Sequence, residues 1–353
     1  MFDAEAVFTQ VRSAWLGRGP NSDIVVSSRI RLARNLADLP FPSMAGKDAL
    51  AEVLSRVRRA TEHLPEARRY QFLELGRLSP LDRQVLIEKH LISPEHAREP
   101  EGRGVVLRDD EAVSIMVNEE DHIRLQVLLP GLDLDAAWQT ANRLDDSLEQ
   151  QLDFAFDEKL GFLTACPTNL GSGLRASIMV HLPALVLLNQ AGQVFTTLSQ
   201  LGVVVRGLYG EGTQALGNLF QISNQLTLNQ SEEDLISNLL ALVGQVMEQE
   251  RAARSRLYQE FGNRLVDMVW RAYGTLTSAR ILTGDEAMKL LSDVRLGVTL
   301  NLLPQVDLST LNRLLILTRP GFIQRVAGQQ LPPAERDVRR AAIVREELLG
   351  KNK

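Results

Sequence analysis

The stretch from Cys166 to Pro183 constrains the chain most, because it joins the only cysteine to a glycine-containing loop, an arginine and a strand. Pro167 fixes the backbone directly after the cysteine. Gly171 and Gly173 allow the chain to turn tightly or to pass close to a ligand. The stretch therefore predicts a loop that holds a thiol beside a bound group.

Arg175 follows this loop, and residues 176–182 have the composition of a β-strand that ends at Pro183. A thiol, a glycine loop and an arginine within ten residues indicate an anionic ligand next to a reactive group. A buried structural cysteine before an ordinary turn would have the same sequence, because free cysteine is among the most buried residue types. Both interpretations stay open at this point.

The composition is that of a soluble globular protein with one large domain or two, at 353 residues, 44% hydrophobic and 24% charged. The longest apolar runs, such as residues 182–188, are too short to cross a bilayer. The N-terminus has no basic segment followed by an apolar one. One cysteine excludes an internal disulfide and a cysteine-based zinc site. We therefore expect a cytoplasmic protein in a reducing compartment.

The charge balance, 39 basic against 44 acidic residues, gives a net charge of −5 and no sign of direct nucleic-acid binding. Lysine occurs at only six positions, so 33 of the basic residues are arginine. The planar guanidinium suits bidentate recognition of phosphate. A compositional bias of the host would produce the same excess.

The pattern of residues predicts a mixed first part and a helical second part. Residues 1–22 form a short helical segment, and strands are expected at 24–32, 70–75, 176–182, 203–206 and 218–224, with further β-structure over 104–129. Helices are expected at 47–63, 80–90, 134–157 and, with a break at Gly192, over 183–201. Beyond Ser231 only helical patterns appear, ending with 285–300, 308–317 and 333–349. We place a boundary near residue 255, inside or at the end of a long helix.

Five arginines lie near the ends of the predicted β-segments: Arg29, Arg31, Arg124, Arg175 and Arg206. Together they could neutralise a triphosphate through charge-assisted hydrogen bonds. The chain has neither a P-loop nor the protein-kinase motifs, so such a site would be built in another way. Carboxylates stand beside two of the arginines, which suits a cationic acceptor next to a phosphate donor.

Four segments carry a resemblance to a known family. They read Ser-Ser-Arg-Ile-Arg at 27–31, Asn-Glu-Glu-Asp-His-Ile-Arg at 118–124, Cys-Pro-Thr-Asn-Leu-Gly-Ser-Gly-Leu-Arg-Ala at 166–176 and Arg-Gly-Leu-Tyr-Gly-Glu at 206–211. In this order they resemble the phosphagen (guanidino) kinases, over about residues 22–255. The resemblance implies an α+β fold, with a phosphagen-kinase-like catalytic domain at 23–255 whose largely antiparallel β-sheet is flanked by helices. An α-helical C-terminal domain at 256–353 follows it.

The domain order points to one branch of the family. Creatine and arginine kinases carry a helical domain before the first of these motifs, whereas here only 26 residues precede Ser27. A helical domain after the catalytic part is similar to the bacterial protein-arginine kinases. The segment Arg-Asp-Val-Arg-Arg-Ala at 336–341 fits a motif of that branch, whose phosphoarginine-binding residues would be Arg336, Asp337, Arg340 and Ala341. A solvated, salt-bridged helix would explain the motif if it stood alone.

The resemblance also implies roles for individual residues. Glu120 and Glu211 would hold the substrate guanidinium, one of them as base, with Glu119 and Asp121 in support. Cys166 would lie beside the guanidinium as a thiolate. A surface histidine is the alternative for His90, whose surroundings are less specific. The implied ATP-binding residues are Ser27, Ser28, Arg29, Ile30, Arg31, His90, Arg124, Arg175, Ala176, Ser177, Ile178, Met179, Arg206, Gly207, Leu208, Tyr209, Gly210 and Glu211. Mg²⁺ would bind the ATP phosphates, and no metal site formed by protein side chains is expected.

The activity implied is transfer of the γ-phosphoryl of ATP to arginine residues of proteins, which marks them for Clp-dependent degradation in a stress response. The implied partners are a zinc-binding activator protein, a heat-shock transcriptional repressor as substrate, the Clp protease and a second copy of the chain. No membrane is involved. Two alternatives remain: a small-molecule guanidino (arginine-type) kinase, and a catalytically silent phosphoarginine-binding scaffold.

Overall fold

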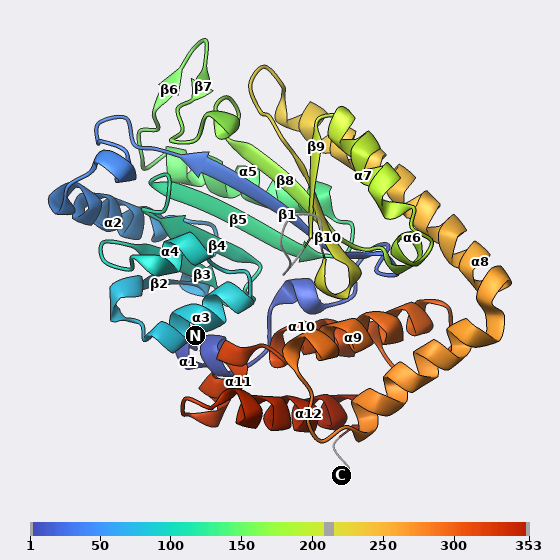
Figure 1. Ribbon diagram of the computed structural model, residues 1–353. Coiled ribbons are helices and arrows are strands. Elements are labelled where there is room, and N and C mark those ends of the chain that lie inside the picture. Colours follow the sequence, from blue (N-terminus) through green and yellow to red (C-terminus); the bar gives the residue numbers. More distant parts are fainter. Residues whose placement is uncertain (1–2, 208–214, 351–353) are drawn as a thin grey trace.

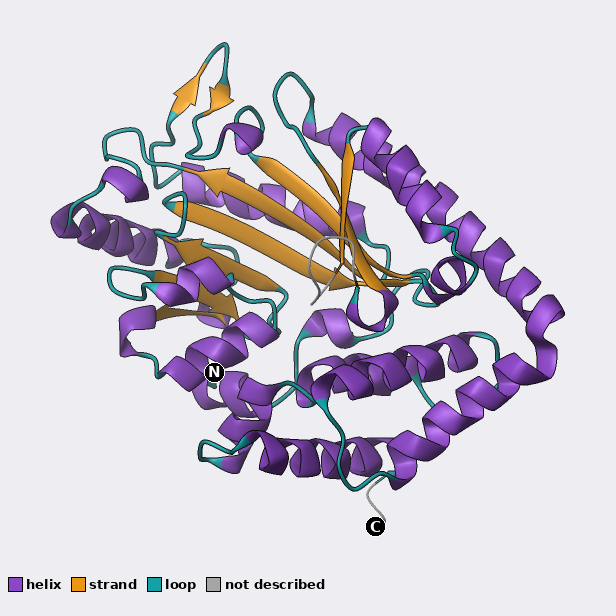
Figure 2. Cartoon of the chain, viewed as in Figure 1, coloured by secondary structure: helices purple, strands orange, loops and turns teal. Residues whose placement is uncertain are grey.

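A large antiparallel sheet forms the centre of the computed structural model, which describes residues 3–207 and 215–350 (Figures 1 and 2). In this part of the chain eight strands pair in the order β2-β3-β4-β5-β1-β8-β10-β9, all antiparallel. The strands are β1 (Val25–Arg34), β2 (Tyr70–Glu74), β3 (Gly104–Arg108), β4 (Val113–Val117), β5 (Ile123–Pro130), β8 (Leu174–His181), β9 (Val203–Gly207) and β10 (Leu219–Asn224). A separate hairpin pairs β6 (Phe156–Asp157) with β7 (Gly161–Phe162). The predicted largely antiparallel sheet is confirmed.

Helices flank the sheet and then form a layer of their own. The helices are α1 (Ala4–Thr9), α2 (Lys47–Thr61), α3 (Pro80–Glu88), α4 (Pro94–Arg98), α5 (Leu134–Glu149), α6 (Pro183–Leu187), α7 (Ala191–Gln200), α8 (Glu232–Ser278), α9 (Gly284–Thr299), α10 (Leu308–Leu317), α11 (Pro320–Ala327) and α12 (Pro333–Leu349). In Figure 1 the long helix α8 runs down one side of the molecule, and α9 to α12 lie together below the sheet. The α+β fold with a helical C-terminal part is confirmed. In the described residues, no helix combines the length and apolarity needed to span a membrane.

The two faces of the sheet differ because side chains alternate along each strand. On β1, Ile30 and Leu32 are fully buried and belong to a large apolar core that includes Ala137 and Ala141 of α5. Arg29 and Arg31, which alternate with them along the strand, and the residues in register with these arginines lie on the opposite face. The apolar face thus anchors the sheet to its helices and leaves a polar face for a binding site.

Three local features differ from the sequence-based prediction. The helix expected over 134–157 ends at Glu149, and its last residues form the first strand of the hairpin instead. The break expected at Gly192 lies at 188–190, between α6 and α7. The short helix α11 was not predicted at all, because its first residues, Pro320 and Gly321, are typical of a turn.

The domain boundary expected near residue 255 falls inside α8, which leads from the catalytic part into the C-terminal helices. Within α8 the backbone leaves helical geometry at Gly262, where φ is 35° and ψ is −110°. Such a positive φ is accessible to glycine because it has no Cβ. The chain therefore changes direction at Gly262, where two helical segments of α8 meet in a kink.

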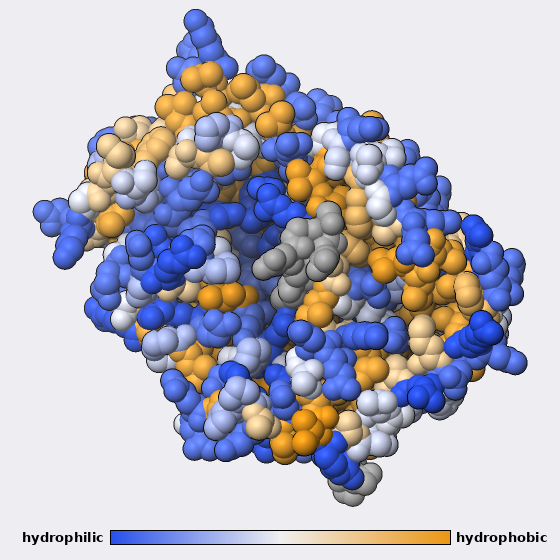
Figure 3. All heavy atoms as spheres, viewed as in Figure 1, coloured by the Kyte–Doolittle hydropathy of each residue, from blue (hydrophilic) through white to orange (hydrophobic). Residues whose placement is uncertain are grey.

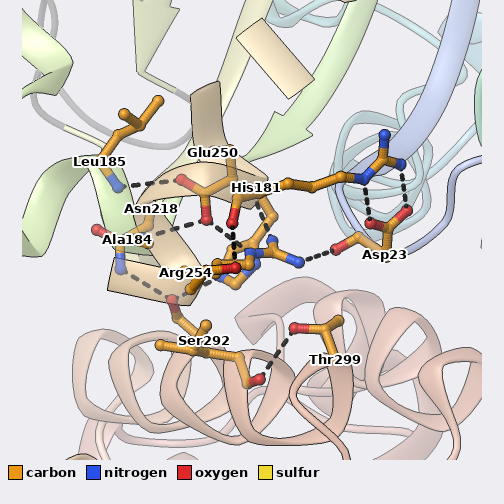
Figure 4. Close-up of polar contacts among 12 residues, drawn as sticks. Asp23, His181, Ala184, Leu185, Asn218, Glu250, Arg254, Ser292 and Thr299 are labelled. Carbon is orange, nitrogen blue, oxygen red and sulfur yellow. Dashed lines mark hydrogen bonds and ion pairs between the residues drawn. The ribbon is translucent and has the colours of Figure 1, made fainter. Parts of the chain in front are cut away.

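A buried polar junction ties α8 to the end of the sheet (Figure 4). Glu250 of α8 accepts hydrogen bonds from the backbone N–H groups of Ala184 and Leu185, at 3.2 and 3.0 Å, in the first turn of α6. Arg254 donates to Glu250 at 2.8 Å and to the carbonyl of Asp23 at 3.1 Å. Because Glu250 and Arg254 are both buried, removing either partner would leave an uncompensated charge.

His181, the last residue of β8, extends this junction to α9. Its Nε2 lies 2.8 Å from Ser292 Oγ, and the Asn218 amide donates to the same oxygen at 2.9 Å (Figure 4). Burial, followed by the charges of Arg295 and Arg254, lowers the pKa of His181 well below 6.5. The folded protein therefore holds His181 as a neutral imidazole.

This neutral histidine predicts a pH-dependent stability. In the unfolded chain His181 takes up a proton below about pH 6.5, but in the folded protein it does not. The contribution of His181 to the free energy of unfolding is therefore complete above that pH and is lost as the pH falls. Replacing His181 by glutamine should reduce the fall in unfolding free energy between pH 7.5 and 5.5 by about 1.4 kcal/mol. Urea unfolding at pH 7.5 and 5.5 measures this slope. The exposed His63, replaced by glutamine, serves as the control, and equal slopes for wild type and His181→Gln would contradict the prediction.

Candidate functional site

Arginines from several strands meet on the polar face of the sheet. On β1, Arg31 lies opposite Arg175 of β8. Two residues away, Arg29 lies opposite Ser177 and donates to Ser177 Oγ at 3.2 Å and to Gln221 Oε1 at 2.6 Å. The strand register thus brings together three arginines that are far apart in the sequence.

Arg124 and Arg206 extend this group onto β5 and the edge strand β9. Arg124 lies on β5, opposite Ala33 of β1, and Arg206 lies on β9, opposite Gln221 of β10. Arg206 is exposed, and its charge acts on Arg175, as does that of Arg124. All five arginines singled out in the sequence therefore belong to one electrostatic cluster, which we call the arginine row.

The arginine row is strongly self-repelling in the absence of an anion. Burial, followed by the charges of Arg124 and Arg175, lowers the pKa of Arg29 to about 9. Burial and the charge of Arg29 likewise lower the pKa of Arg31 well below its ordinary value. Among the described residues, the buried Nε atoms of Arg31 and Arg175 have no hydrogen-bond partner. A polyanion would supply both the missing acceptors and the missing charge.

A pocket of about 450 Å³ opens over one end of the row. Arg29, Arg31 and Arg124 line it on the sheet side, and His90 lines it where α3 ends. Apolar side chains complete the wall, among them Ile87, Ile92 and Met116. In the view of Figure 3 the molecule is hollowed near its centre, and hydrophilic residues line the hollow. The pocket therefore combines a cationic floor with an apolar wall.

His90 is half-buried in this pocket, and its ring lies edge-on to Trp15 with centroids 5.4 Å apart. Burial, followed by the charges of Arg29 and Arg319, lowers the pKa of His90 to about 3. His90 is therefore neutral at physiological pH. It can make a hydrogen bond in the pocket without adding another positive charge.

The three consecutive acids differ in their surroundings. Glu119 is buried, forms an ion pair with Arg124 and accepts a hydrogen bond from Ser93. Asp121 is also buried and accepts from the Asn35 amide and from the backbone N–H of Ala165, both at 2.7 Å. Glu119 thus fixes an arginine of the row, and Asp121 fixes the chain just before Cys166.

Glu120 is exposed, unlike its two neighbours. Partial burial and the nearby Asp121 charge raise the pKa of Glu120, and a hydrogen bond with the Cys166 thiol partly opposes this. Cys166 is half-buried, with its Sγ 3.0 Å from Thr168 Oγ1. The charges of Cys166 and Glu120 in turn favour the cationic form of Arg175, whose pKa is lowered chiefly by burial. A carboxylate and a thiol therefore stand together at the Arg175 end of the row.

Several residues expected at an ATP site have buried side chains. Ile30, Ala176 and Ile178 belong to the apolar core on the opposite face of the sheet. Ser28 Oγ donates to the carbonyl of Gly131 at 2.8 Å, and the buried Met179 packs in a second apolar cluster. Ser27 is buried and Gly207 ends β9. The remaining expected residues, Leu208, Tyr209, Gly210 and Glu211, lie outside the described residues.

The motif on α12 is partly committed to the fold. Arg340 is buried, and its guanidinium donates to the carbonyls of Thr318 and Leu282, both at 2.8 Å, and to Asp337. Ala341 is buried in the C-terminal apolar cluster. Arg336 is half-buried and lies one turn before Arg340. Arg340 therefore braces the C-terminal helices, and Arg336 is the more accessible of the two arginines.

Comparisons with known proteins agree with this geometry. Residues 52–253 match the family model for the catalytic domain of ATP:guanido phosphotransferases, described as "ATP:guanido phosphotransferase, C-terminal catalytic domain". Residues 262–353 match the model "Protein-arginine kinase McsB C-terminal domain". A curated relative named protein-arginine kinase, from Symbiobacterium thermophilum, is 54% identical over 344 residues, which are 96% of this chain and 98% of that protein. The chain belongs to the protein-arginine kinase family.

A second curated relative supports the assignment of this chain to the protein-arginine kinase family. The protein-arginine kinase of Moorella thermoacetica is 55% identical over 342 residues, which are 96% of this chain and 98% of the relative. Among solved structures, lombricine kinase is similar with a TM-score of 0.59 and 25% identity, covering 72% of each chain. The catalytic fold is thus that of the phosphagen kinases, and the chain is a kinase.

The sequence reading missed four residues of the site in this kinase. Asn35, Ser93 and Gln221 position Asp121, Glu119 and Arg29 respectively. Arg319, from the C-terminal helices, lines the pocket beside His90. For Asn35, Ser93 and Arg319 the sequence carries no signal, because each of them reaches the site only through tertiary packing. The alternation of β10 was the single available hint, since it places Gln221 between buried Phe220 and Ile222.

Proposed function

We propose that this protein transfers the γ-phosphoryl of ATP to the guanidinium of arginine residues in proteins. The observation that carries the proposal is the arginine row, with its unsatisfied Nε atoms, ending at Glu120 and Cys166. The row suits the phosphates of ATP, and the exposed carboxylate suits a guanidinium. The relatives' shared name, protein-arginine kinase, supports the same acceptor.

In the proposed reaction a guanidinium nitrogen attacks the γ-phosphorus, and the bond from that phosphorus to the β-γ bridging oxygen breaks to release ADP. Glu120 and Glu211 orient the guanidinium, and one of them accepts its proton as the N–P bond forms. Such a base is needed because the guanidinium pKa lies above ~12 in water. Glu119 and Asp121 act indirectly, since they hold Arg124 and the Cys166 segment in place.

Mg²⁺ would accompany ATP in this reaction. In the described residues, no group of three or more His, Cys, Asp or Glu side chains is arranged to hold a metal ion. The arginine-lined pocket instead fits the phosphates to which Mg²⁺ binds, with water completing its coordination. The ion would neutralise charge on the phosphates while the arginine row fixes their position.

The proposal is tested by supplying ATP labelled at the γ-phosphate with either an arginine-rich protein or free arginine. We expect acid-labile label on the protein. Label on free arginine alone would favour a small-molecule guanidino kinase. Label on neither, in a protein that still binds phosphoarginine, would favour a silent scaffold.

Cys166 is expected to be reactive, because it is half-buried beside Glu120 and Arg175. It is the only cysteine, so any thiol modification maps to it. Iodoacetamide should label it quickly near neutral pH, abolish activity and be blocked by ATP together with substrate. Mass spectrometry of the labelled protein measures the rate. Slow labelling that leaves activity intact would assign Cys166 a purely structural role.

The wider setting of the proposal follows from the family resemblance. We infer action in the cytoplasm during stress, on a heat-shock transcriptional repressor among other proteins, with the phosphoarginine read by the Clp protease. A zinc-binding activator protein and a second copy of the chain are the expected partners. Co-purification of the tagged protein before and after heat shock tests each partner directly.

We also propose that Arg336, with Asp337 and Arg340, binds phosphoarginine and so regulates the enzyme. Binding by arginine forks would select phosphoarginine over arginine. Arg340 already donates to two carbonyls, so its loss would disturb the fold as well. Arg336→Ala is therefore the sharper variant.

Arg336→Ala is expected to keep basal activity and to lose stimulation by added phosphoarginine. Arg339→Ala is the matched control, since Arg339 is exposed on the same helix. Calorimetric titration of phosphoarginine, together with the rate of substrate phosphorylation, measures both effects. Equal stimulation of all three proteins would contradict this role.

A further inference from the structure

The pocket over the arginine row is not closed by the catalytic part alone. Arg319 and Pro320, at the start of α11, line it together with Arg29, Arg31 and His90. These residues lie beyond the long helix α8, in the C-terminal helices. A side chain from the second part of the chain therefore forms part of the wall of the proposed ATP site.

Arg319 is held there by a buried contact between α11 and α3. Glu88, near the end of α3, accepts hydrogen bonds from the backbone N–H groups of Gly321 and Phe322, both at 2.8 Å. A Cβ on Gly321 would lie 2.6 Å from the Gln84 side chain and 2.8 Å from the Glu88 carboxylate, so a larger residue there would force these side chains to move. The carboxylate satisfies the free N–H groups of the first turn of α11.

Three further contacts hold the same segment. Arg325 of α11 forms ion pairs with Asp82 of α3 and with Glu5, each at 2.7 Å. From the other side, Arg340 donates to the carbonyl of Thr318 at 2.8 Å. The backbone on both sides of Arg319 is thus fixed relative to α3, which leads directly to His90. Arg319 is consequently a preorganised part of the pocket.

The order of charges along the site shows which end of ATP Arg319 faces. Glu120, Cys166 and Arg175 stand at one end, where the proposed phosphoryl transfer takes place. Arg29 lies two residues before Arg31 on β1, opposite Ser177 rather than Arg175, and it lines the pocket together with His90 and Arg319. Because the γ-phosphate must lie at the transfer end, the nucleoside must lie toward His90 and Arg319. The nearby Ile87 and Pro94 offer the apolar surface that a base requires.

We propose that Arg319 binds the nucleoside end of ATP, with its planar guanidinium packed against the base, so that the C-terminal helices complete the nucleotide site. Guanidinium groups stack on flat aromatic rings, whereas lysine offers only a point charge. This inference rests on the proposed use of ATP. It adds a specificity-determining residue that no catalytic motif contains.

The test compares ADP with inorganic tripolyphosphate as ligands of the full-length protein. Calorimetry should show that Arg319→Ala weakens ADP binding by about 10-fold, the scale of a lost stacking contact, and leaves tripolyphosphate binding within about 2-fold. The KM for ATP should rise in parallel while kcat changes little. Arg319→Lys should recover only part of the ADP affinity, because it restores charge without the plane.

Arg313→Ala is the matched control, because Arg313 is an exposed arginine of the same helical part whose partner is Glu347. Circular dichroism establishes that each variant is folded. An Arg319→Ala protein that is folded and binds ADP as wild type does would overturn the inference, and so would equal losses for ADP and tripolyphosphate. A wild-type protein that binds no ADP would instead overturn the proposed function, and this inference with it.

Discussion

Replacing Glu120 by glutamine is expected to lower kcat by at least ~10²-fold, with little change in the KM for ATP. The amide keeps the size of the side chain but can neither accept the guanidinium proton nor attract its charge. The proposed contacts with ATP should remain, because Glu119 holds Arg124 independently of Glu120. Initial rates of protein phosphorylation at saturating ATP measure the effect.

The pH dependence of the same reaction gives a second readout. Burial and Asp121 raise the pKa of Glu120, so the ionised form needed for proton transfer is lost as the pH falls through a value above 4.5. Wild type should therefore show an acidic limb that Glu120→Gln lacks. Glu62→Gln, an exposed carboxylate on the surface, is the control for a general effect of charge. Near-normal turnover in Glu120→Gln would remove Glu120 from the mechanism.

Replacing Arg31 by methionine is expected to abolish activity and, without nucleotide, to make the protein more stable. Burial and the charges of Arg29, Arg124 and Arg175 all disfavour the cationic Arg31, while only Glu119 among its charged neighbours opposes them. Removing a buried charge from such a cluster is often stabilising by about 1 kcal/mol or more. In a chain of 353 residues, about 1 kcal/mol corresponds to a rise in Tm of roughly 1–2 °C.

The same variant should lose the stabilisation that ADP confers on wild type, because a ligand stabilises only the state that it binds. Thermal unfolding with and without ADP measures both effects in one experiment. Arg59→Met removes a surface arginine whose side chain is 67% exposed, and it should change neither. A fall in Tm for Arg31→Met would show that Arg31 supports the fold instead of straining it.

Regular elements with a strong period were predictable, whereas features decided by tertiary contact were not. The strand that carries Arg29 and Arg31 and the helix that carries Arg336 follow directly from alternation and helical spacing. Helix α11 does not, because its first turn depends on Glu88 of α3, which accepts hydrogen bonds from the backbone N–H groups of Gly321 and Phe322. The hairpin after α5 was also missed, since strands of two residues leave no detectable pattern.

The candidate site shows the same division. The motifs identified the arginine row and the acids, because charge-bearing residues at strand ends are recognisable in sequence. The family resemblance gave Glu120 a different role from Glu119 and Asp121, but the sequence did not show that Glu120 is exposed and the other two are buried. That difference depends on Ser93 and Asn35, which reach the two buried acids only in the folded protein. Arg319 was invisible for a related reason, as only the packing of α11 against α3 brings it to the pocket.

The junction around Glu250 and Arg254 limits how this protein can be divided or recombined. A chain cut at residue 255 would keep both side chains but lose Ser292, the partner of His181, and with it Arg319 and the contact that covers Glu88. The catalytic half therefore cannot be exchanged between proteins independently of the C-terminal helices. A chimera between two relatives would inherit a working core only if both sides of this junction came from the same parent.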